Sequence, residues 1–283
     1  MNKEKHMSKI VFLDVDGTLI DYEAKTPASA KTAIAAARAN GHKVYICTGC
    51  SKAEIEQRDL PELDGMIGGN GAYVEDNGTV VMHQGLSPED VRHIVDWCNE
   101  RHLGFYLEAN SGMYCNDYML EQGPETMVKY ASGKGADLSA AKQSASRFIN
   151  SFIHLQGEDL YRNDVNKISF ILSSYQDHLD SKEEFPHLVA NTWGGKGDSR
   201  CSVISGPQAS PRNMRSKCFL ITCMPTRKIR SRSETLRSIF PCLSCAHTMS
   251  LWATAVRRSR LQLTISQPTS MMTDCIMRSV ISN

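Results

Sequence analysis

Short apolar runs alternate with helix-forming segments in the N-terminal part of the chain, and this alternation limits the folds open to it. Lys9–Asp14, Lys43–Cys47 and Met66–Gly69 are short, apolar and rich in β-branched residues, which predicts buried strands. Thr26–Arg38, with Thr26 as its cap, and Ser51–Arg58 predict the helices between them. Strand and helix in this order indicate βαβ units, and therefore an α/β fold with a doubly wound parallel sheet.

Composition excludes several other classes of protein. The 283 residues are 41% hydrophobic and 22% charged, close to an average globular protein and unlike disordered, collagen-like or coiled-coil chains. No stretch approaches the roughly 18 apolar residues of a membrane span, and the N-terminus lacks the apolar core of a signal peptide. We therefore expect a cytoplasmic protein with no membrane partner.

Two carboxylates directly follow the first predicted strand. Asp14-Val15-Asp16-Gly17-Thr18 stands at the carboxyl end of that strand, where ligands of parallel sheets gather. Such a pair suits Mg²⁺, which prefers oxygen ligands, and Gly17 allows the turn that exposes backbone N–H groups. One carboxylate can attack phosphorus while the other moves a proton. A plain turn without chemistry is the alternative, but the preceding strand and the Gly-Thr that follows favour a site.

The next two strands also end in polar residues. Thr48-Gly49 follows the second strand, where a hydroxyl and a backbone N–H can hold phosphate oxygens, although this dipeptide is also common in purely structural turns. Asn70-Gly71 follows the third strand and either lines the same pocket or only turns the chain. A hairpin comes next, with strands at Tyr73–Glu75 and Val80–Met82 joined by an Asn-Gly turn.

These motifs together resemble the haloacid dehalogenase superfamily, and within it the Cof-type phosphatases. D-V-D-G-T-L after the first strand resembles the first motif of that superfamily, I-C-T-G-C its second, and N-G-A before a hairpin is typical of the Cof-type branch. The resemblance covers about residues 8–198. It implies a Rossmann-like core that uses Mg²⁺, bound by Asp14 and Asp16, to hydrolyse small phosphorylated metabolites such as sugar phosphates. Asp14 would be the nucleophile and Asp16 the general acid/base, and Thr48 and Gly49 would hold the transferring phosphoryl group. Gly17, Asn70 and Gly71 are further candidates for binding phosphate.

The resemblance also implies a domain organisation. Residues 1–83 would form the first part of the core, residues 84–190 an inserted class-II α/β cap, and residues 191–198 the return to the core. Within the cap we predict helices at Ser87–Glu100 and Tyr175–Glu184, and four strands. The strands are Phe105–Leu107, Met113–Cys115, Ile153–Leu155 and Lys167–Leu172. Trp97 is expected in the core, whereas the scattered histidines (His83, His93, His102 and His154) lack the spacing of metal ligands.

Composition changes abruptly after residue 198. Residues 1–198 hold 19 Lys and Arg against 29 Asp and Glu, a net charge of −10. Residues 199–283 hold 13 against 2, a net charge of +11, together with six of the ten cysteines and one of the 19 glycines. The segment also lacks sustained strand or helix periodicity. We interpret residues 199–283 as an out-of-frame tail that is not natively folded and replaces the rest of the core.

The missing motifs and the genetic code support this interpretation. The family has a lysine and a G-D-x-x-x-D loop after the cap, and neither occurs in residues 199–283. In a frame moved back by one base, Glu234–Leu243 can encode G-D-A-K-V-D-I-P-M-F, and Pro211–Phe219 can encode T-K-E-H-A-I-E-V-L. Arg212 thus stands in place of the lysine, and Thr235 and Ile239 in place of the two aspartates. The change of frame is expected near Gly197–Ser199.

Three alternatives are weaker. The basic tail could be a nucleic-acid-binding arm, but a change of reading frame accounts for its composition as well as for the missing motifs. Cys242-x-x-Cys245 with His247 could be half a zinc site, but no second Cys pair completes the ligand set. We therefore expect no nucleic-acid partner. The third alternative is a non-catalytic remnant that folds poorly or binds phosphate weakly, since the chain as written lacks half of the family's motifs. The sequence does not indicate an oligomeric state.

Overall fold

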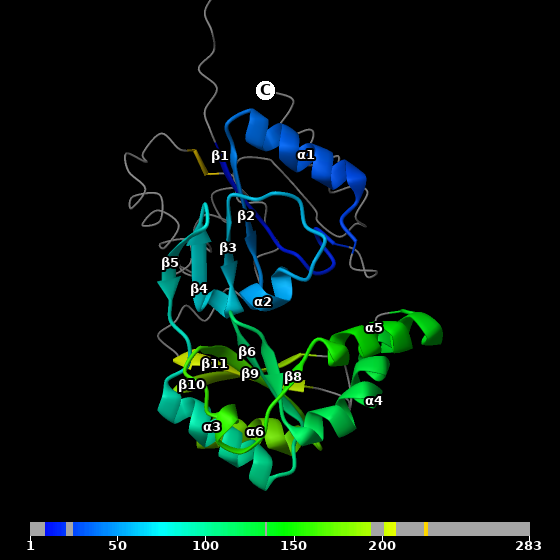
Figure 1. Ribbon diagram of the computed structural model, residues 1–283, viewed down its shortest axis with the longest axis vertical. Coiled ribbons are helices and arrows are strands. Elements are labelled where there is room, and N and C mark those ends of the chain that lie inside the picture. Colours follow the sequence, from blue (N-terminus) through cyan, green and yellow to red (C-terminus); the bar gives the residue numbers. More distant parts are fainter. Residues whose placement is uncertain (1–8, 21–24, 134, 194–200, 208–223, 226–283) are drawn as a thin grey trace, which may run out of the picture. The chain divides into compact units, whose positions relative to one another are not determined.

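The computed structural model describes residues 9–20, 25–133, 135–193, 201–207 and 224–225 (Figure 1). These residues form two compact units. The first contains residues 9–20, 25–49, 58–82 and 224–225, and the second contains residues 50–57, 83–193 and 201–207. Each unit has its own six-stranded sheet, which confirms the α/β class.

The sheet of the first unit has the strand order β12-β1-β2-β3-β4-β5. Its parallel part consists of β1 (Lys9–Leu13), β2 (Lys43–Cys47) and β3 (Gly65–Gly68), as the apolar runs predicted. Leu13 pairs with Ile46 and Cys47 pairs with Ile67, so the three strands end side by side. Residues that directly follow these strands therefore lie at one edge of the sheet.

Antiparallel strands flank this parallel part. On one side, β4 (Tyr73–Asp76) pairs with β3 and continues through the Asn77-Gly78 turn into β5 (Thr79–His83). Asn77 and Gly78 have φ values of 48° and 74°, the conformation of a tight hairpin turn. On the other side of β1 lies the two-residue β12 (Met224–Pro225), paired antiparallel. From β1, the described parallel strands β2 and β3 follow one another to one side of the sheet. The second half expected of a doubly wound sheet lies outside the described residues.

Helix α1 (Ala28–Ala39) connects β1 to β2 and buries Ala30, Ala33, Ile34 and Ala37. The predicted Thr26 cap is wrong. Pro27 occupies the cap position, and the Thr26 hydroxyl donates instead to the carbonyl oxygen of Asp59 at 2.6 Å. A tertiary partner has therefore replaced the local one. The helix predicted at Ser51–Arg58 is shorter, with α2 covering Lys52–Ile55 in the second unit.

The sheet of the second unit has the strand order β10-β11-β9-β6-β7-β8. Its central strands are β6 (Phe105–Ala109) and β9 (Val165–Ile171), which pair antiparallel. β7 (Met113–Cys115) pairs with β6, and β8 (Ile153–His154) runs parallel to β7. β10 (Leu188–Trp193) and β11 (Cys201–Pro207) form a hairpin joined to β9.

This hairpin corrects the expected end of the cap. Of residues 191–198, Asn191, Thr192 and Trp193 pair with β11 in the second sheet, and residues 194–198 lie outside the described part of the chain. Cys201–Pro207, placed by the sequence in an unfolded tail, is an internal strand of that sheet and is hydrogen-bonded on both sides. The two rows of hydrogen bonds supply the order that the composition of this segment does not suggest. The remaining tail residues, apart from β12, lie outside the described part of the chain.

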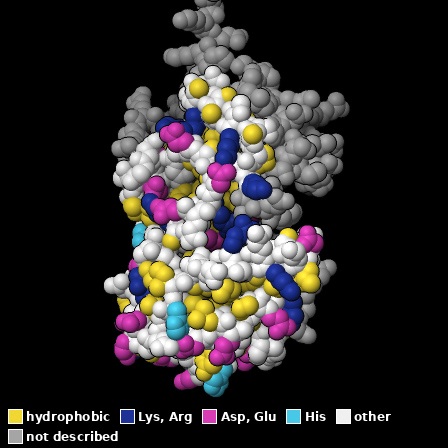
Figure 2. Space-filling model, turned by 45° about the vertical axis from the view of Figure 1, so that its right-hand side comes forward, with side chains coloured by type: hydrophobic (Ala, Val, Ile, Leu, Met, Phe, Trp, Pro, Cys, Tyr) yellow, Lys and Arg dark blue, Asp and Glu magenta, His cyan; other side chains and the backbone are white. Residues whose placement is uncertain are grey.

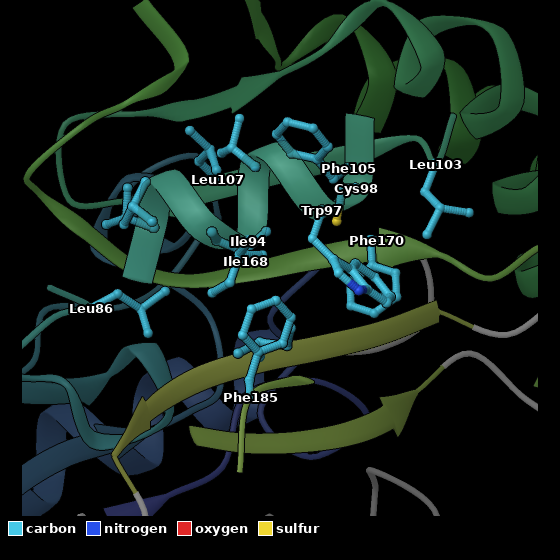
Figure 3. Close-up of a cluster of buried hydrophobic side chains, with 14 of the residues drawn as sticks. Leu86, Ile94, Trp97, Cys98, Leu103, Phe105, Leu107, Ile168, Phe170 and Phe185 are labelled. Atoms are coloured by element: carbon cyan, nitrogen blue, oxygen red, sulfur yellow. The ribbon is translucent and has the colours of Figure 1, made fainter. Parts of the chain in front are cut away.

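One face of the second sheet is covered by α3 (Pro88–Glu100) and by residues next to α6 (Tyr175–Glu184). Figure 3 shows side chains of this buried cluster, among them Trp97, Phe170 and Phe185. Trp97, 4% exposed, meets Phe170 and Phe185 edge-to-face with ring centroids 5.6 and 5.7 Å apart, which confirms its predicted core position. Ser87 caps α3 as predicted, since its hydroxyl accepts the N–H of Asp90 at 3.0 Å.

The other face is covered by α4 (Asp117–Gly133) and α5 (Leu138–Asn150), which the sequence patterns did not predict. Gly123 and Pro124 interrupt the helical pattern of α4, and a short 3-10 turn, η2 (Gly157–Leu160), follows β8. Four histidines of the second unit interact within it: His83 with Asn166, His93 with Glu184, His102 with the ring of Tyr118, and His154 with Asp117.

The surface drawn in Figure 2 carries Lys and Arg interspersed with Asp and Glu over the described residues. The segments considered above as a nucleic-acid-binding arm or a zinc half-site, with Cys242, Cys245 and His247, lie outside those residues. Along the described part of the chain, no helix combines the length and apolar character needed to cross a membrane.

Candidate active site

The loop after β1 is a tightly closed turn around Val15. The N–H groups of Thr18, Leu19 and Ile20 all donate to the Val15 carbonyl oxygen, at 3.2, 3.0 and 3.0 Å. Gly17 permits the turn with a φ of 74°. Its own N–H donates to the Ile20 carbonyl at 3.1 Å, so this group takes part in closing the turn.

Asp14 stands where β1 meets this turn and is partly buried. The hydroxyl of Thr18 donates to Oδ2 of Asp14 at 2.8 Å. Burial is the main cause that raises the pKa of Asp14, and the nearby charge of Asp16 raises it further. Hydrogen bonds from Thr18 and from the Val15 backbone act in the opposite direction without reversing the shift. The carboxylate is therefore oriented by Thr18 and partly shielded from water.

Asp16 lies on the outer side of the same turn. Its side chain is 48% exposed, and its Oδ1 forms an ion pair with Nη1 of Arg58 at 3.3 Å. Arg58 precedes β3 and is 42 positions away in the chain. Arg58 was not among the predicted site residues, because nothing in the local sequence pattern around it indicates this contact with Asp16.

Thr48 and Gly49 follow β2. Thr48 is 6% exposed and its N–H donates to the Ile67 carbonyl at 2.9 Å, which extends the pairing of β2 with β3 by one residue. The backbone N–H expected to face phosphate therefore belongs to Gly49, which is exposed. This narrows the predicted role of the dipeptide to the Thr48 side chain and the Gly49 backbone.

Asn70 lies in the short turn η1 (Gly69–Gly71) that follows β3, with φ 58° and ψ 28°. This left-handed conformation is uncommon for residues other than glycine, and Asn tolerates it better than most. A Cβ added to Gly49 would lie 3.0 Å from Oδ1 of Asn70. The structure thus brings the second and third strand ends into contact, with Gly71 (φ 95°) beside them.

The donor set of the first loop fits a hard divalent cation. Burial is the main cause of the raised pKa of Asp14, and the charge of Asp16 on the same loop adds to it. A cation bound beside Asp14 would offset both effects. Mg²⁺ commonly takes one or two carboxylates and completes its shell with water and substrate phosphate. Among the described residues no group of three or more His, Cys, Asp and Glu side chains gathers as a metal site. The pair Asp14 and Asp16 therefore fits a Mg²⁺ that keeps several waters.

Comparison with known proteins identifies the family. The family model for haloacid dehalogenase-like hydrolases matches residues 11–205, more than half of the chain. The chain belongs to the haloacid dehalogenase-like hydrolase family. The match includes all the predicted site residues, and it extends through most of β11, beyond the boundary expected at residue 198.

Among curated relatives, phosphatase YwpJ of Bacillus subtilis (strain 168) is 25% identical over 187 residues, covering 61% of this chain and 64% of YwpJ. Two further B. subtilis proteins are 31% and 30% identical over 116 and 95 residues. The matches cover 38% and 33% of this chain, and 43% and 37% of those proteins. The chain therefore spans less than two thirds of the length of these relatives.

Solved structures of the family share the fold. A haloacid dehalogenase-like hydrolase from B. subtilis gives a TM-score of 0.59 at 17% identity, covering 70% of this chain and 73% of that one. A sugar phosphatase of subclass IIB gives a TM-score of 0.50 at 20% identity, covering 70% of both chains. At these identities the likeness establishes the α/β fold.

Proposed function

We propose that the protein derives from a Mg²⁺-dependent phosphatase that hydrolyses small phosphorylated metabolites through an aspartyl-phosphate at Asp14. The observation that carries this proposal is the meeting of polar residues at the ends of β1, β2 and β3. Asp14, Thr48 and Asn70 follow these neighbouring strands, and Gly49 approaches Asn70 closely. Family membership and the relative named as a phosphatase support the same reaction class.

The two aspartates have different roles in the proposed reaction. A carboxylate oxygen of Asp14, oriented by Thr18, attacks phosphorus, and the bond from phosphorus to the leaving oxygen breaks. Asp16 donates a proton to the leaving alcohol. Asp16 then accepts a proton from a water that attacks the aspartyl-phosphate, and this second step releases phosphate and restores Asp14. When bound, Mg²⁺ would be held by both carboxylates and would offset the charge of the phosphoryl oxygens.

The other strand ends hold the phosphoryl group. The Thr48 hydroxyl and the Gly49 N–H donate to phosphoryl oxygens, and Asn70 adds a neutral donor beside them. Gly17 and Gly71 keep the backbone close to the group because they carry no side chain. Donors fixed before the reaction stabilise transition-state charge without reorganisation, which is commonly the largest single contribution to catalysis.

We also propose that residues 84–207, within the second unit, are the substrate-selecting cap, extended beyond residue 190 by β10 and β11. A cap excludes water and chooses the group attached to phosphate. The subclass IIB sugar phosphatase with the same fold is consistent with sugar phosphates as one substrate class. We also propose a cytoplasmic location for the protein.

The chain as written carries only half of this proposed machinery. Arg212, Thr235 and Ile239 stand where the family has its lysine and two further aspartates, and all three lie outside the described residues. We propose a change of reading frame as the cause. The second candidate function, a non-catalytic remnant that binds phosphate weakly, follows from the same three replacements.

The nucleophile test uses a chain whose frame is restored after β11. Asp14→Asn should abolish Mg²⁺-dependent hydrolysis of an aryl phosphate, because it removes the attacking oxygen and one cation ligand together. Circular dichroism and the melting temperature should stay close to those of the parent. Activity above roughly 10% of the parent would contradict the assignment, since loss of a nucleophile costs far more than tenfold.

A further inference from the structure

A row of polar residues crosses one face of the second sheet. Glu108 of β6 lies directly opposite Lys167 of β9, and Lys167 lies opposite Ser205 of β11. Directly paired residues share one face of a sheet, so these three residues (the polar row) lie on the same side. Ser169, two residues after Lys167, lies on this face too and donates its hydroxyl to Oε1 of Glu108 at 2.8 Å.

Further along the same strands this face is apolar. Ile171 and Cys201, which pair with each other, belong to a buried cluster that includes Met127 of α4 and Ala145 of α5. The two helices therefore cover the apolar half of the face. The polar row forms the other half.

Glu108 and Lys167 form a buried ion pair. The side chain of Glu108 is 1% exposed and that of Lys167 is 11% exposed, and Nζ of Lys167 contacts Oε2 of Glu108. Removing two charges from water commonly costs more than their attraction returns, and a well-packed apolar pair of similar volume is often more stable. The stability of the sheet therefore does not by itself explain this pair.

The pair has hydrogen-bonding capacity that the described residues leave unused. An ammonium group has three N–H donors, and among the described residues Glu108 is the one ion-pair partner of Lys167. Oε2 of Glu108 contacts that ammonium, yet no described group donates a hydrogen bond of proper geometry to it. Buried polar groups without partners are costly, so a ligand that both donates and accepts hydrogen bonds would be favoured here.

Charge narrows the class of ligand. Burial would lower the pKa of the Lys167 ammonium, but the charges of Glu108 and of Glu54, on α2 of the same unit, raise it. Lys167 is therefore charged at neutral pH, and two carboxylates act on this one ammonium. The excess negative charge would repel an anionic group, whereas a hydroxyl group can accept from the ammonium and donate to a carboxylate.

Resting on the proposed function, in which the second unit selects the substrate, we propose that Lys167 and Glu108 recognise a neutral polyhydroxylated group attached to the phosphate. Lys167 donates to a hydroxyl oxygen of this group, and Oε2 of Glu108 accepts a hydrogen bond from a hydroxyl. Sugar and polyol phosphates are thus preferred over phosphorylated carboxylic acids.

The experiment measures affinities of the full chain by isothermal titration calorimetry with Mg²⁺ present. The probes are inorganic phosphate, glucose 6-phosphate and 3-phosphoglycerate, of which the last carries a carboxylate in addition to its phosphate. The variant combines Glu108→Gln with Lys167→Met, because removing one partner alone would leave an unpaired buried charge. Since the double variant keeps the net charge of the parent, it tests hydrogen bonding rather than charge.

The matched control combines Arg162→Met with Asp164→Asn. This replacement also removes an ion pair of the second unit and keeps the net charge. Arg162 stacks on Tyr114, which belongs to the buried cluster on the opposite face of the sheet, so the polar row stays intact. Melting temperatures verify that each variant is folded.

We expect the parent to bind glucose 6-phosphate about tenfold more tightly than inorganic phosphate, as for one charged hydrogen bond. It should bind 3-phosphoglycerate more weakly than glucose 6-phosphate. The Glu108→Gln, Lys167→Met variant should raise the Kd for glucose 6-phosphate about tenfold and change the other two little. The control should change none of the three.

A parent chain that binds glucose 6-phosphate no more tightly than the other probes, or binds none of them, would overturn the inference. An unchanged Kd for glucose 6-phosphate in the double variant would also overturn it. Equal weakening of all three probes would show that the pair only supports the fold. The Asp14→Asn hydrolysis assay in the restored chain decides the proposed function separately, because it depends on the nucleophile and not on this pair.

Discussion

At the scale of single residues, the site depends on side chains that must stay small. Gly49 has an ordinary backbone conformation. Glycine is needed at this position because a side chain would be crowded, and not because of the φ value. Its Cα faces Oδ1 of Asn70, and a Cβ there would be tighter than ordinary van der Waals contact at 3.0 Å. Asn70 is itself held in a left-handed turn between two glycines. The relative position of these two residues thus fixes where the donors of β2 and β3 point.

Gly49→Ala should therefore weaken phosphate binding more than it weakens the fold. The added methyl group displaces the Asn70 amide by a few tenths of an ångström, and we expect the Kd for phosphate to rise about tenfold, as for one lost charged hydrogen bond. The free energy of unfolding should fall by about 1 kcal/mol or less. Calorimetry and urea unfolding measure the two quantities.

Gly133→Ala is the control for this variant, since a Cβ at Gly133 meets no atom within 4 Å. It should leave phosphate binding unchanged. If Gly49→Ala bound phosphate as tightly as the parent, the proposed role of the Gly49 backbone would be wrong.

At the scale of elements, one carboxylate joins α1 to the amino ends of β2 and β3. Oδ2 of Asp64 accepts the Val44 N–H at 2.8 Å and pairs with Nε of Arg38 at 3.2 Å, and Oδ1 pairs with Nζ of Lys43 at 2.8 Å. The Asp64 side chain is 5% exposed. This group lies at the opposite end of the strands from the candidate site, so it acts on stability rather than on chemistry.

Asp64→Asn should lower the free energy of unfolding at neutral pH by about 1–3 kcal/mol, because charged hydrogen bonds are lost. Burial alone would raise the pKa of Asp64, but the hydrogen bonds from Lys43 and Val44 and the charges of Lys43 and Arg38 outweigh it and lower the pKa below 3.8. A lowered pKa in the folded state contributes stability above the unfolded value and loses it as pH falls.

The difference between parent and variant should accordingly be constant above about pH 5 and shrink as pH falls from about 4 toward 3. Urea unfolding across this range measures it. Glu62→Gln, which removes an exposed carboxylate paired with Arg38, is the comparison and should change stability little. A difference that grew toward low pH would mean that Asp64 has a raised pKa in the folded protein.

At the scale of the whole molecule, the chain contains one part that matches its family and one that does not. The match ends at residue 205, inside β11, and the second sheet is complete through Pro207. The basic, glycine-poor composition found after residue 198 therefore includes at least one segment with a regular place in the fold. We therefore propose that the change of frame, which the sequence led us to expect near residues 197–199, lies after β11.

Correcting one nucleotide after the codon for Pro207 should convert an inactive chain into a phosphatase. The correction returns two aspartates and a lysine, and losing one such group commonly costs around 10²–10³-fold in rate. We expect no Mg²⁺-dependent hydrolysis of an aryl phosphate by the chain as written and clear hydrolysis after correction.

The same correction made at Gly197–Ser199 is the control, because it also replaces the residues of β11 and should give a less stable protein. Equal activity of the uncorrected chain and the chain corrected after Pro207 would mean that the present tail supplies a site of its own. If neither chain hydrolysed the aryl phosphate, the corrected chain would be tested with a panel of phosphorylated metabolites, because the proposed cap selects the substrate. Inactivity toward the whole panel would contradict the role proposed for Asp14.

The sequence by itself determined those features that depend on neighbouring residues. β1 and β2 were predicted nearly to the residue because a buried parallel strand needs a short apolar run. The hairpin at Asn77-Gly78 and the Ser87 cap of α3 follow from local turn and cap chemistry. The family, too, was indicated by a motif of consecutive residues around Asp14.

The tertiary structure alone decided the features that join distant residues. Arg58 forms an ion pair with Asp16, and the buried Lys167 forms one with Glu108. The local sequence patterns around these four residues do not indicate either contact. Thr26 caps no helix because Asp59 offers its hydroxyl another partner. Residues 201–207 join a sheet because β9 and β10 leave two rows of backbone groups for them to bond. Local patterns encode local hydrogen bonds and periodic burial, whereas these contacts form only after the chain has folded.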